Sequence, residues 1–106
     1  MAADLAHRTR GSAAYPSPMP ALHDPAAHVQ LAFFRDGHLT TLPSRSSYRL
    51  AALAVLAERF EPGRRYAERE VSAILAEDAP DPATLRRLLV DHGLLSRAAG
   101  VYWRDR

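Results

Sequence analysis

The stretch DPATLRRLLVDHGLLSRAAGVYW, residues 81–103, contains the local signals that decide the fold. It begins with Asp-Pro, the residue types preferred at a helix N-cap and at the first helical position. Gly93 stands where a helix would end on a left-handed glycine. The runs LLSR at 94–97 and VYWR at 101–104 then predict two short strands that turn through residues 98–100. The stretch therefore predicts a helix followed directly by a β-hairpin.

The chain upstream repeats the same start signal at Asp24 and Pro25. The segment AAHVQLAFFRD continues this helix, and Gly37 is predicted to end it. HLTTL at 38–42 alternates apolar and polar residues, which predicts a short strand.

A second helix is predicted over residues 45–60, with Ser44 as its cap. After a turn at 61–63, a two-residue strand is predicted at 65–66 and a third helix at 68–75. The residues that we expect to face inward are Leu50, Leu53, Ala54, Ala57 and Phe60 in the second helix, Val71, Ile74 and Leu75 in the third, and Leu85, Leu88 and Leu89 in the last.

The order helix, strand, helix, short strand, helix, helix, hairpin predicts a mainly helical α+β domain over residues 24–106. Read from Ser44 onward, this order is that of a winged helix, with one helix added before it. Residues 1–23 lack periodicity and are rich in Ala, Pro and Ser. We expect that segment to be a disordered tail, because it offers too little apolar surface to offset its ordering entropy.

The length of 106 residues fits one domain. The absence of cysteine excludes disulfides, thiolate metal sites and cysteine nucleophiles. No stretch approaches the roughly 18 consecutive apolar residues that a membrane span needs. The N-terminus also lacks an apolar run that could serve as a secretory signal. These observations predict a cytoplasmic protein with no membrane partner.

The net charge of +2 is compatible with a polyanionic partner and does not require one. All 14 basic residues are arginine, whose planar guanidinium suits bidentate contacts with phosphate and guanine. The codon usage of a GC-rich genome would also favour arginine. Residues 44–106 carry eleven arginines and nine acidic residues, so the excess positive charge lies in the predicted folded part.

The candidate nucleic-acid contacts lie on the last helix and the hairpin. With the leucines facing inward, Thr84, Arg86 and Arg87 should face outward, where the arginines could hold phosphates or a base edge. Arg97 and Arg104, in the hairpin strands, should lie beside them. The alternative interpretation is a solvated helix face.

Two further observations bear on these alternatives. On a solvated face, Arg87 would pair with Asp91 four residues later. Arg64 and Arg65 belong to an arginine-rich segment, RFEPGRRYAERE at 59–70, which could contact backbone phosphates. Its interleaved glutamates favour a salt-bridged surface instead.

Several segments resemble a bacterial family, the domain of unknown function 2087. They are FRDGHLTTLPS, LAERFEPGRRYAEREV, DPATLRRLLVDHGLLSR and GVYWR, and they occur in the family's order between Phe34 and Arg104. Family members stand alone or are joined to helix-turn-helix regulators, so the resemblance implies a link to transcription. It assigns no functional residues, because no activity is established for the family.

No constellation of catalytic or metal-binding residues is present in the sequence. The five histidines include no pair at i,i+4 spacing, and there is neither a nucleophile elbow nor a glycine-rich phosphate loop. We therefore predict no enzyme activity, no metal and no cofactor.

Two functions remain open. The first is a transcription-associated module that binds nucleic acid, with double-stranded DNA as the expected partner, mainly through arginine contacts to backbone phosphates. The second is a dimerisation or protein-interaction module of a bacterial regulator, with no direct nucleic-acid contact. The second should expose an apolar patch, which we expect around Tyr102 or Phe34.

Overall fold

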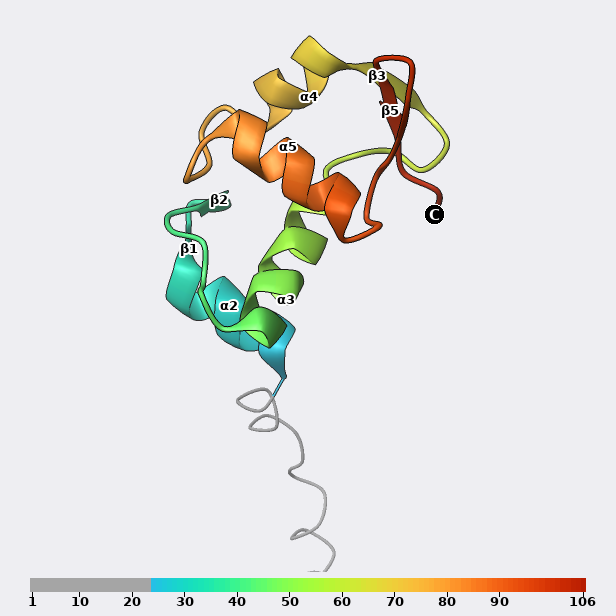
Figure 1. Cartoon of the computed structure of the whole chain (residues 1–106). Helices are drawn as coiled ribbons and strands as arrows, with labels where there is room; N and C mark the ends of the chain where they lie inside the picture. Colours follow the sequence, from blue (N-terminus) through green and yellow to red (C-terminus); the bar gives the residue numbers. More distant parts are fainter. Residues whose placement is uncertain (1–23) are drawn as a thin grey trace, which may run out of the picture.

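The computed structural model describes residues 24–106, and the predicted tail over residues 1–23 lies outside them. The described chain forms four helices and two small antiparallel sheets, which confirms the predicted α+β class (Figure 1). The elements run in the order α2 (Pro25–Phe33), β1 (Phe34–Arg35), β2 (His38–Leu39), α3 (Ser46–Ala57), β3 (Arg65–Ala67), α4 (Glu68–Ile74), α5 (Pro82–Asp91), β4 (Ser96–Ala98) and β5 (Val101–Trp103). None of these helices is long and apolar enough to span a membrane.

Helix α2 is shorter than predicted. Its start is confirmed, because the Asp24 side chain accepts a hydrogen bond from the backbone N–H of Ala26 at 3.0 Å. It ends at Phe33, and the predicted continuation to Gly37 is wrong. Asp36 and Gly37 both have positive φ, 54° and 81°, as a tight hairpin turn requires. They join β1 to β2, so the predicted strand over 38–42 is only two residues long.

Helix α3 buries a different stripe from the one predicted. Leu53, Ala57 and Phe60 are buried as expected, together with Ala52 and Leu56, but Leu50 remains 45% exposed and its inward assignment is wrong. The segment LAALAVLA is apolar at every position, so spacing alone fits two neighbouring faces. The predicted Ser44 cap is also wrong, because the N-cap position is Arg45 and no side chain caps the helix.

The structure confirms the predicted strand and helix that follow α3. Strand β3 leads directly into α4, and the Glu70 side chain accepts a hydrogen bond from the backbone N–H of Ala67 at 2.8 Å. Val71 and Leu75 of this segment are fully buried, and Ile74 packs against the core.

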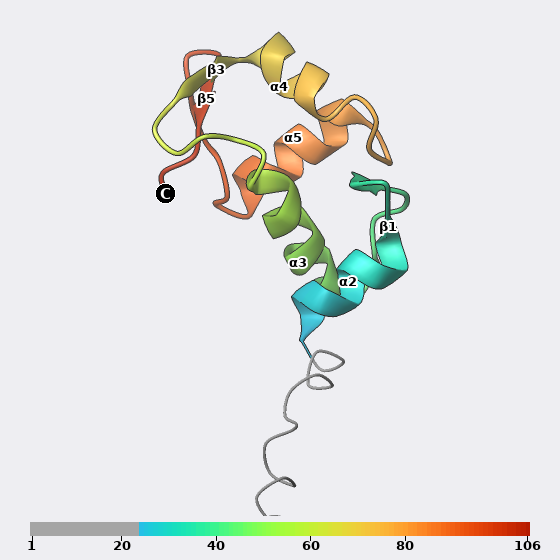
Figure 2. The same cartoon turned by 180° about the vertical axis from the view of Figure 1, so that it is seen from behind.

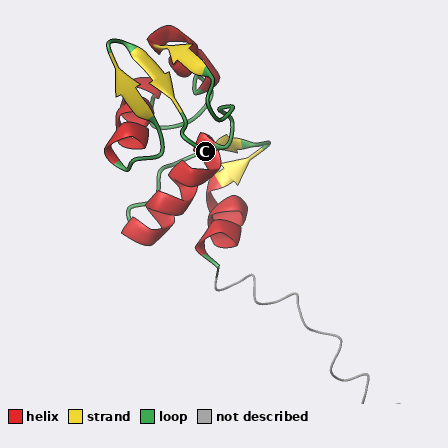
Figure 3. Ribbon diagram, turned by 90° about the vertical axis from the view of Figure 1, so that its right-hand side faces the viewer, coloured by secondary structure: helices red, strands yellow, loops and turns green. Residues whose placement is uncertain are grey.

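Helix α5 and the hairpin after it also form as predicted. Asp81 caps the helix, and Gly93 ends it with a φ of 75°. Ala99 and Gly100 both have positive φ and form the hairpin turn, one residue shorter than predicted. The three strands form one sheet in the order β3-β5-β4, separate from the β1–β2 hairpin (Figure 3).

The hydrophobic core fixes the orientation of α5. This helix packs against both α3 and α4 (Figure 2), and its Leu85 and Leu89 are fully buried. Tyr66 and Tyr102 pair across β3 and β5 and close the core from the sheet. One face of α5 is thus used for packing, and the opposite face is directed toward solvent.

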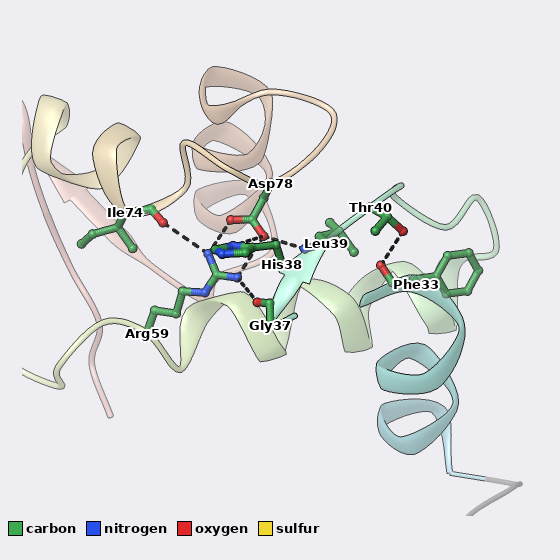
Figure 4. Close-up of polar contacts among 8 residues, drawn as sticks. All are labelled: Phe33, Gly37, His38, Leu39, Thr40, Arg59, Ile74 and Asp78. Atoms are coloured by element: carbon green, nitrogen blue, oxygen red, sulfur yellow. Dashed lines mark hydrogen bonds and ion pairs between the residues drawn. The ribbon is translucent and has the colours of Figure 1, made fainter. Parts of the chain in front are cut away.

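A buried ion pair fastens the β1–β2 hairpin to this core (Figure 4). The fully buried Asp78 carboxylate accepts hydrogen bonds from Arg59 and from the backbone N–H of Leu39, the latter at 2.7 Å. Arg59 also donates to the carbonyls of Ile74 at 3.2 Å and Gly37 at 2.8 Å. These contacts join three segments that are distant in the sequence, the β1–β2 hairpin, Arg59 after α3 and residues 74–78 at the end of α4, so the pair holds the tertiary structure together.

Candidate nucleic-acid interface

A pocket of about 280 Å³ lies between α5, the start of α4 and the β4–β5 hairpin. It brings together Thr84, Arg86, Arg87 and Arg97 from the predicted site, with Glu68, Asp91 and Tyr102. Arg86 and Arg87 are consecutive residues of α5. Because each residue of an α-helix is rotated by about 100° from the one before it, their side chains point in different directions. Arg97 reaches the pocket from β4, where it lies directly opposite Tyr102 in the sheet.

Arg86 is held in place by the protein itself. It donates to Ser72 Oγ at 2.8 Å, and its Nη2 lies 3.4 Å from Glu68 Oε2. Its guanidinium lies 5.9 Å from the centroid of the Tyr102 ring, which is within cation–π range. The side chain is only 18% exposed, so Arg86 faces solvent far less than the sequence suggests.

Arg87 and Arg97 differ from Arg86 because both are exposed. Neither forms an ion pair with any residue of the described chain, so the alternative pair between Arg87 and Asp91 is not formed. The Arg97 guanidinium lies 5.7 Å from the Tyr102 centroid. The pocket therefore holds two arginines that form no direct ion pair within residues 24–106, although the Asp81 carboxylate acts on Arg87 at longer range.

The first turn of α5 borders the same pocket. Thr84 donates its backbone N–H to Asp81 Oδ1 at 2.8 Å and its hydroxyl to Asp81 Oδ2 at 3.0 Å. The backbone hydrogen bond from Thr84, together with that from its hydroxyl, lowers the pKa of the Asp81 carboxyl below its ordinary value of 3.8. The Thr84 hydroxyl thus serves the helix cap.

Residues 38–104 match the model of a family described as an uncharacterized protein conserved in bacteria (DUF2087). The matched span covers more than half of the chain and includes every residue of the pocket. The chain belongs to the DUF2087 family. No curated protein and no solved structure matches it.

The remaining predicted residues of this DUF2087 domain lie outside the pocket. Arg104 donates to the Phe60 carbonyl at 3.0 Å and borders a separate hollow, beside the end of α3. Arg65 lies on β3, with its guanidinium 4.6 Å from the Trp103 ring centroid. Sequence position alone suggested that Arg104 would join Arg86 and Arg87, and the fold does not bring them together.

Arg64 fits the alternative interpretation of its segment. Its guanidinium lies 4.0 Å from Glu61 and 3.9 Å from Glu70, and it also lies over the Tyr66 ring at 4.9 Å. This is the salt-bridged surface that the interleaved glutamates indicate.

Sequence reasoning missed two residues of this site in the DUF2087 domain: Glu68, which lines the pocket, and Ser72, which accepts a hydrogen bond from Arg86. It named Tyr102 only as the centre of an exposed apolar patch. Tyr102 and Trp103 are neighbours on one strand, so strand alternation directs them to opposite faces of the sheet without deciding which one faces the helices. The register supplies the answer, because Tyr102 pairs with the buried Tyr66. The contact between Arg86 and Ser72 joins two helices, and no local pattern encodes it.

Proposed function

We propose that this DUF2087 domain binds nucleic acid, with double-stranded DNA as its partner, mainly through arginine contacts to backbone phosphates. One observation carries the proposal. Arg87 and Arg97 come from different elements, line one concave surface, and form no direct ion pair within residues 24–106. Guanidinium groups arranged in this way suit phosphate oxygens.

The order of the elements supports a winged-helix-like assignment. The succession α3, β3, α4, α5, β4, β5, with the sheet order β3-β5-β4, has the connectivity of that fold. In this assignment α5 is the helix presented to the DNA, and the β4–β5 hairpin is the wing. The hairpin turn contains only two residues, so the wing contributes mainly through Arg97 on its strand.

The exposed stripe of α5 favours phosphate contacts over base recognition. Ala83, Arg87 and Asp91 are its exposed residues at successive helical turns. Arg87 is the single long donor among them, and Asp91 is repelled by phosphates. We therefore expect affinity that depends strongly on salt and weakly on sequence.

Fluorescence anisotropy of a labelled random duplex tests this function. The full chain is titrated against the duplex at about 50 and about 200 mM salt, a range over which phosphate-led binding weakens steeply. We expect micromolar binding at the lower salt concentration that fades at the higher one. Absence of binding at low salt would overturn the proposal.

The alternative function, protein association, has a different supporting observation. Leu31 on α2 is 78% exposed and Leu50 on the neighbouring α3 is 45% exposed. Tyr102, around which a patch was expected, is only 2% exposed, and Phe34 is partly buried. Sedimentation velocity of the wild type and of Leu31→Glu checks this alternative. Self-association that the substitution abolishes would favour it, and a monomer at all concentrations would count against a homodimer.

A further inference from the structure

We infer that the pocket between α5 and the β4–β5 hairpin seats one phosphodiester group, which Arg87 holds from the helix and Arg97 from the hairpin. Arg86 is assigned as a positioning residue that does not contact the phosphate. This inference rests on the proposed function for the source of the phosphodiester. It goes further by naming the contacting residues and by limiting the pocket to one group.

The fixed arrangement around Tyr102 separates the roles of the arginines. Arg86 has an anion beside it, Glu68, and a hydrogen-bond acceptor, Ser72. Arg97 approaches the same aromatic ring and has no anion of its own. Two guanidinium groups within 6 Å of one ring centroid repel each other, and only the charge of Arg86 is compensated. An external anion beside Arg97 would compensate its charge and relieve its repulsion with Arg86.

The charge of the pocket lining favours one kind of anion. Arg86, Arg87 and Arg97 line the pocket with two carboxylates, Glu68 and Asp91, so the lining carries one net positive charge. Asp81 lies outside the lining, and its charge interaction with Arg87 is the weakest of the interactions that act on its carboxyl. A phosphodiester carries one negative charge and balances this excess. A phosphate monoester, with up to two negative charges, would leave part of its charge uncompensated beside Asp91.

The rigidity and size of the pocket fit a single small group. Tyr102 is 2% exposed and lies in the central strand of its sheet, so it forms a fixed floor beneath Arg97. The volume of about 280 Å³ lies at or below the lower limit of about 300 Å³ that is usual for pockets holding whole small molecules. A backbone phosphate fits this description better than an entire nucleotide.

A double-mutant cycle on duplex binding tests the sharing of one phosphate. The variants are Arg87→Gln, Arg97→Gln and the double substitution, with Arg35→Gln on β1 as a matched loss of exposed charge. If both arginines hold the same phosphate, the double variant lowers the log–log salt slope by about 0.9, and the affinity losses are less than additive. Additive losses with a slope reduced by about 1.8 would overturn the inference. Arg35→Gln should bind as the wild type does.

A second measurement separates this inference from the proposed function. The full chain is titrated with dimethyl phosphate and, separately, with inorganic phosphate, and the side-chain Nε–Hε signals of its arginines are followed by NMR. We expect dimethyl phosphate to shift the signals of Arg87 and Arg97, and the double variant to abolish the response at the pocket. The same shifts in a chain that binds no duplex would refute DNA binding and support a free phosphodiester as the ligand. Duplex binding without shifts at these residues would refute the pocket, and a response to inorganic phosphate alone would refute the diester assignment.

The positioning role of Arg86 has its own readout. Because Arg86→Gln removes no phosphate contact, it should weaken duplex binding without changing the salt slope, and it should move the Arg97 Nε–Hε signal in the free protein. A loss of slope equal to that of Arg87→Gln would make Arg86 a direct contact. A change in melting temperature with wild-type affinity would make it purely structural.

Discussion

The arginine beneath the β1–β2 hairpin and the arginines beside the β4–β5 hairpin have the same chemistry and opposite surroundings. Arg59 donates to a fully buried carboxylate and to two backbone carbonyls, so its hydrogen-bonding groups are largely used within the protein. Arg87 and Arg97 are exposed and form no ion pair with the described chain. A guanidinium of the first kind stabilises the fold, and one of the second kind is available to an external anion.

The largest effects are expected from two substitutions in the core, at the buried ion pair and at the packed face of α5. Asp78→Ala leaves the Arg59 charge and the Leu39 N–H without their buried acceptor. We expect a loss of about 3 kcal/mol in the free energy of unfolding, at the lower end of the range for a broken buried pair, because Arg59 retains some contact with water. Urea denaturation measures it, with the exposed Asp91→Ala as the control. A loss equal to that of the control would remove the distinction between the two regions.

Leu89→Ala tests the packed face of α5, and we expect a loss of unfolding free energy of similar size. Leu89 is fully buried, so the substitution should cost about 2–5 kcal/mol of unfolding free energy. Leu31→Ala makes the same chemical change at a side chain that is 78% exposed, and it should change stability by less than about 0.5 kcal/mol. Equal melting temperatures for the two variants would show that α5 is oriented differently.

Arg86 and Arg87 give the sharpest test, because they are adjacent in sequence. Arg86→Ala removes the contacts with Ser72 and Glu68 and should cost about 1–2 kcal/mol of stability. Arg87→Ala should change stability by less than about 0.5 kcal/mol, since it removes no ion pair. Thermal unfolding of the two single variants checks the difference. Equal destabilisation by both would contradict the separate roles assigned to them.

The smallest expected effect is the pH dependence of the stability that the Asp81 cap gives to α5. The pKa of Asp81 is lowered in the folded chain by the hydrogen bonds from Thr84, so its contribution to stability is present above 3.8 and is lost as the pH falls through the lower folded value. Asp81→Asn keeps a capping oxygen but cannot ionise. Its melting temperature should therefore fall less than that of the wild type between about pH 7 and about pH 3. An equal fall in the melting temperature of Asp81→Asn and of the wild type between the two pH values would contradict this assignment.

The sequence predicted the elements whose signals are local. The Asp81 cap, the Gly93 stop and the C-terminal hairpin each depend on residues within a few positions of one another, and all three formed. The end of α2 was predicted wrongly although its signal was local. The Asp-Gly pair at 36–37 favours a hairpin turn as well as a helix stop, and in the structure it forms the turn between β1 and β2.

The contacts between distant elements could not be predicted in this way. Arg59 and Asp78 are separated by 19 positions and lie in a segment where many charges alternate, so no spacing rule selects this pair. In the candidate site, too, local patterns were predicted correctly and contacts between distant elements were not. Arg87 was placed correctly outward by helical periodicity, whereas the partial burial of Arg86 depends on Ser72 of another helix. Arg104 was misplaced because its surroundings depend on the end of α3.

Two-dimensional ¹H–¹⁵N NMR of the full chain with the duplex tests most directly whether DNA contacts the α5 pocket. Addition of the random duplex at low salt should shift the backbone signals of residues 83–91 and of Arg97, and leave those of the β1–β2 hairpin and Arg59 unchanged. Shifts confined to α2 and the exposed Leu31 and Leu50, or to the outer face of the sheet around Trp103, would contradict the assignment of the α5 pocket as the interface.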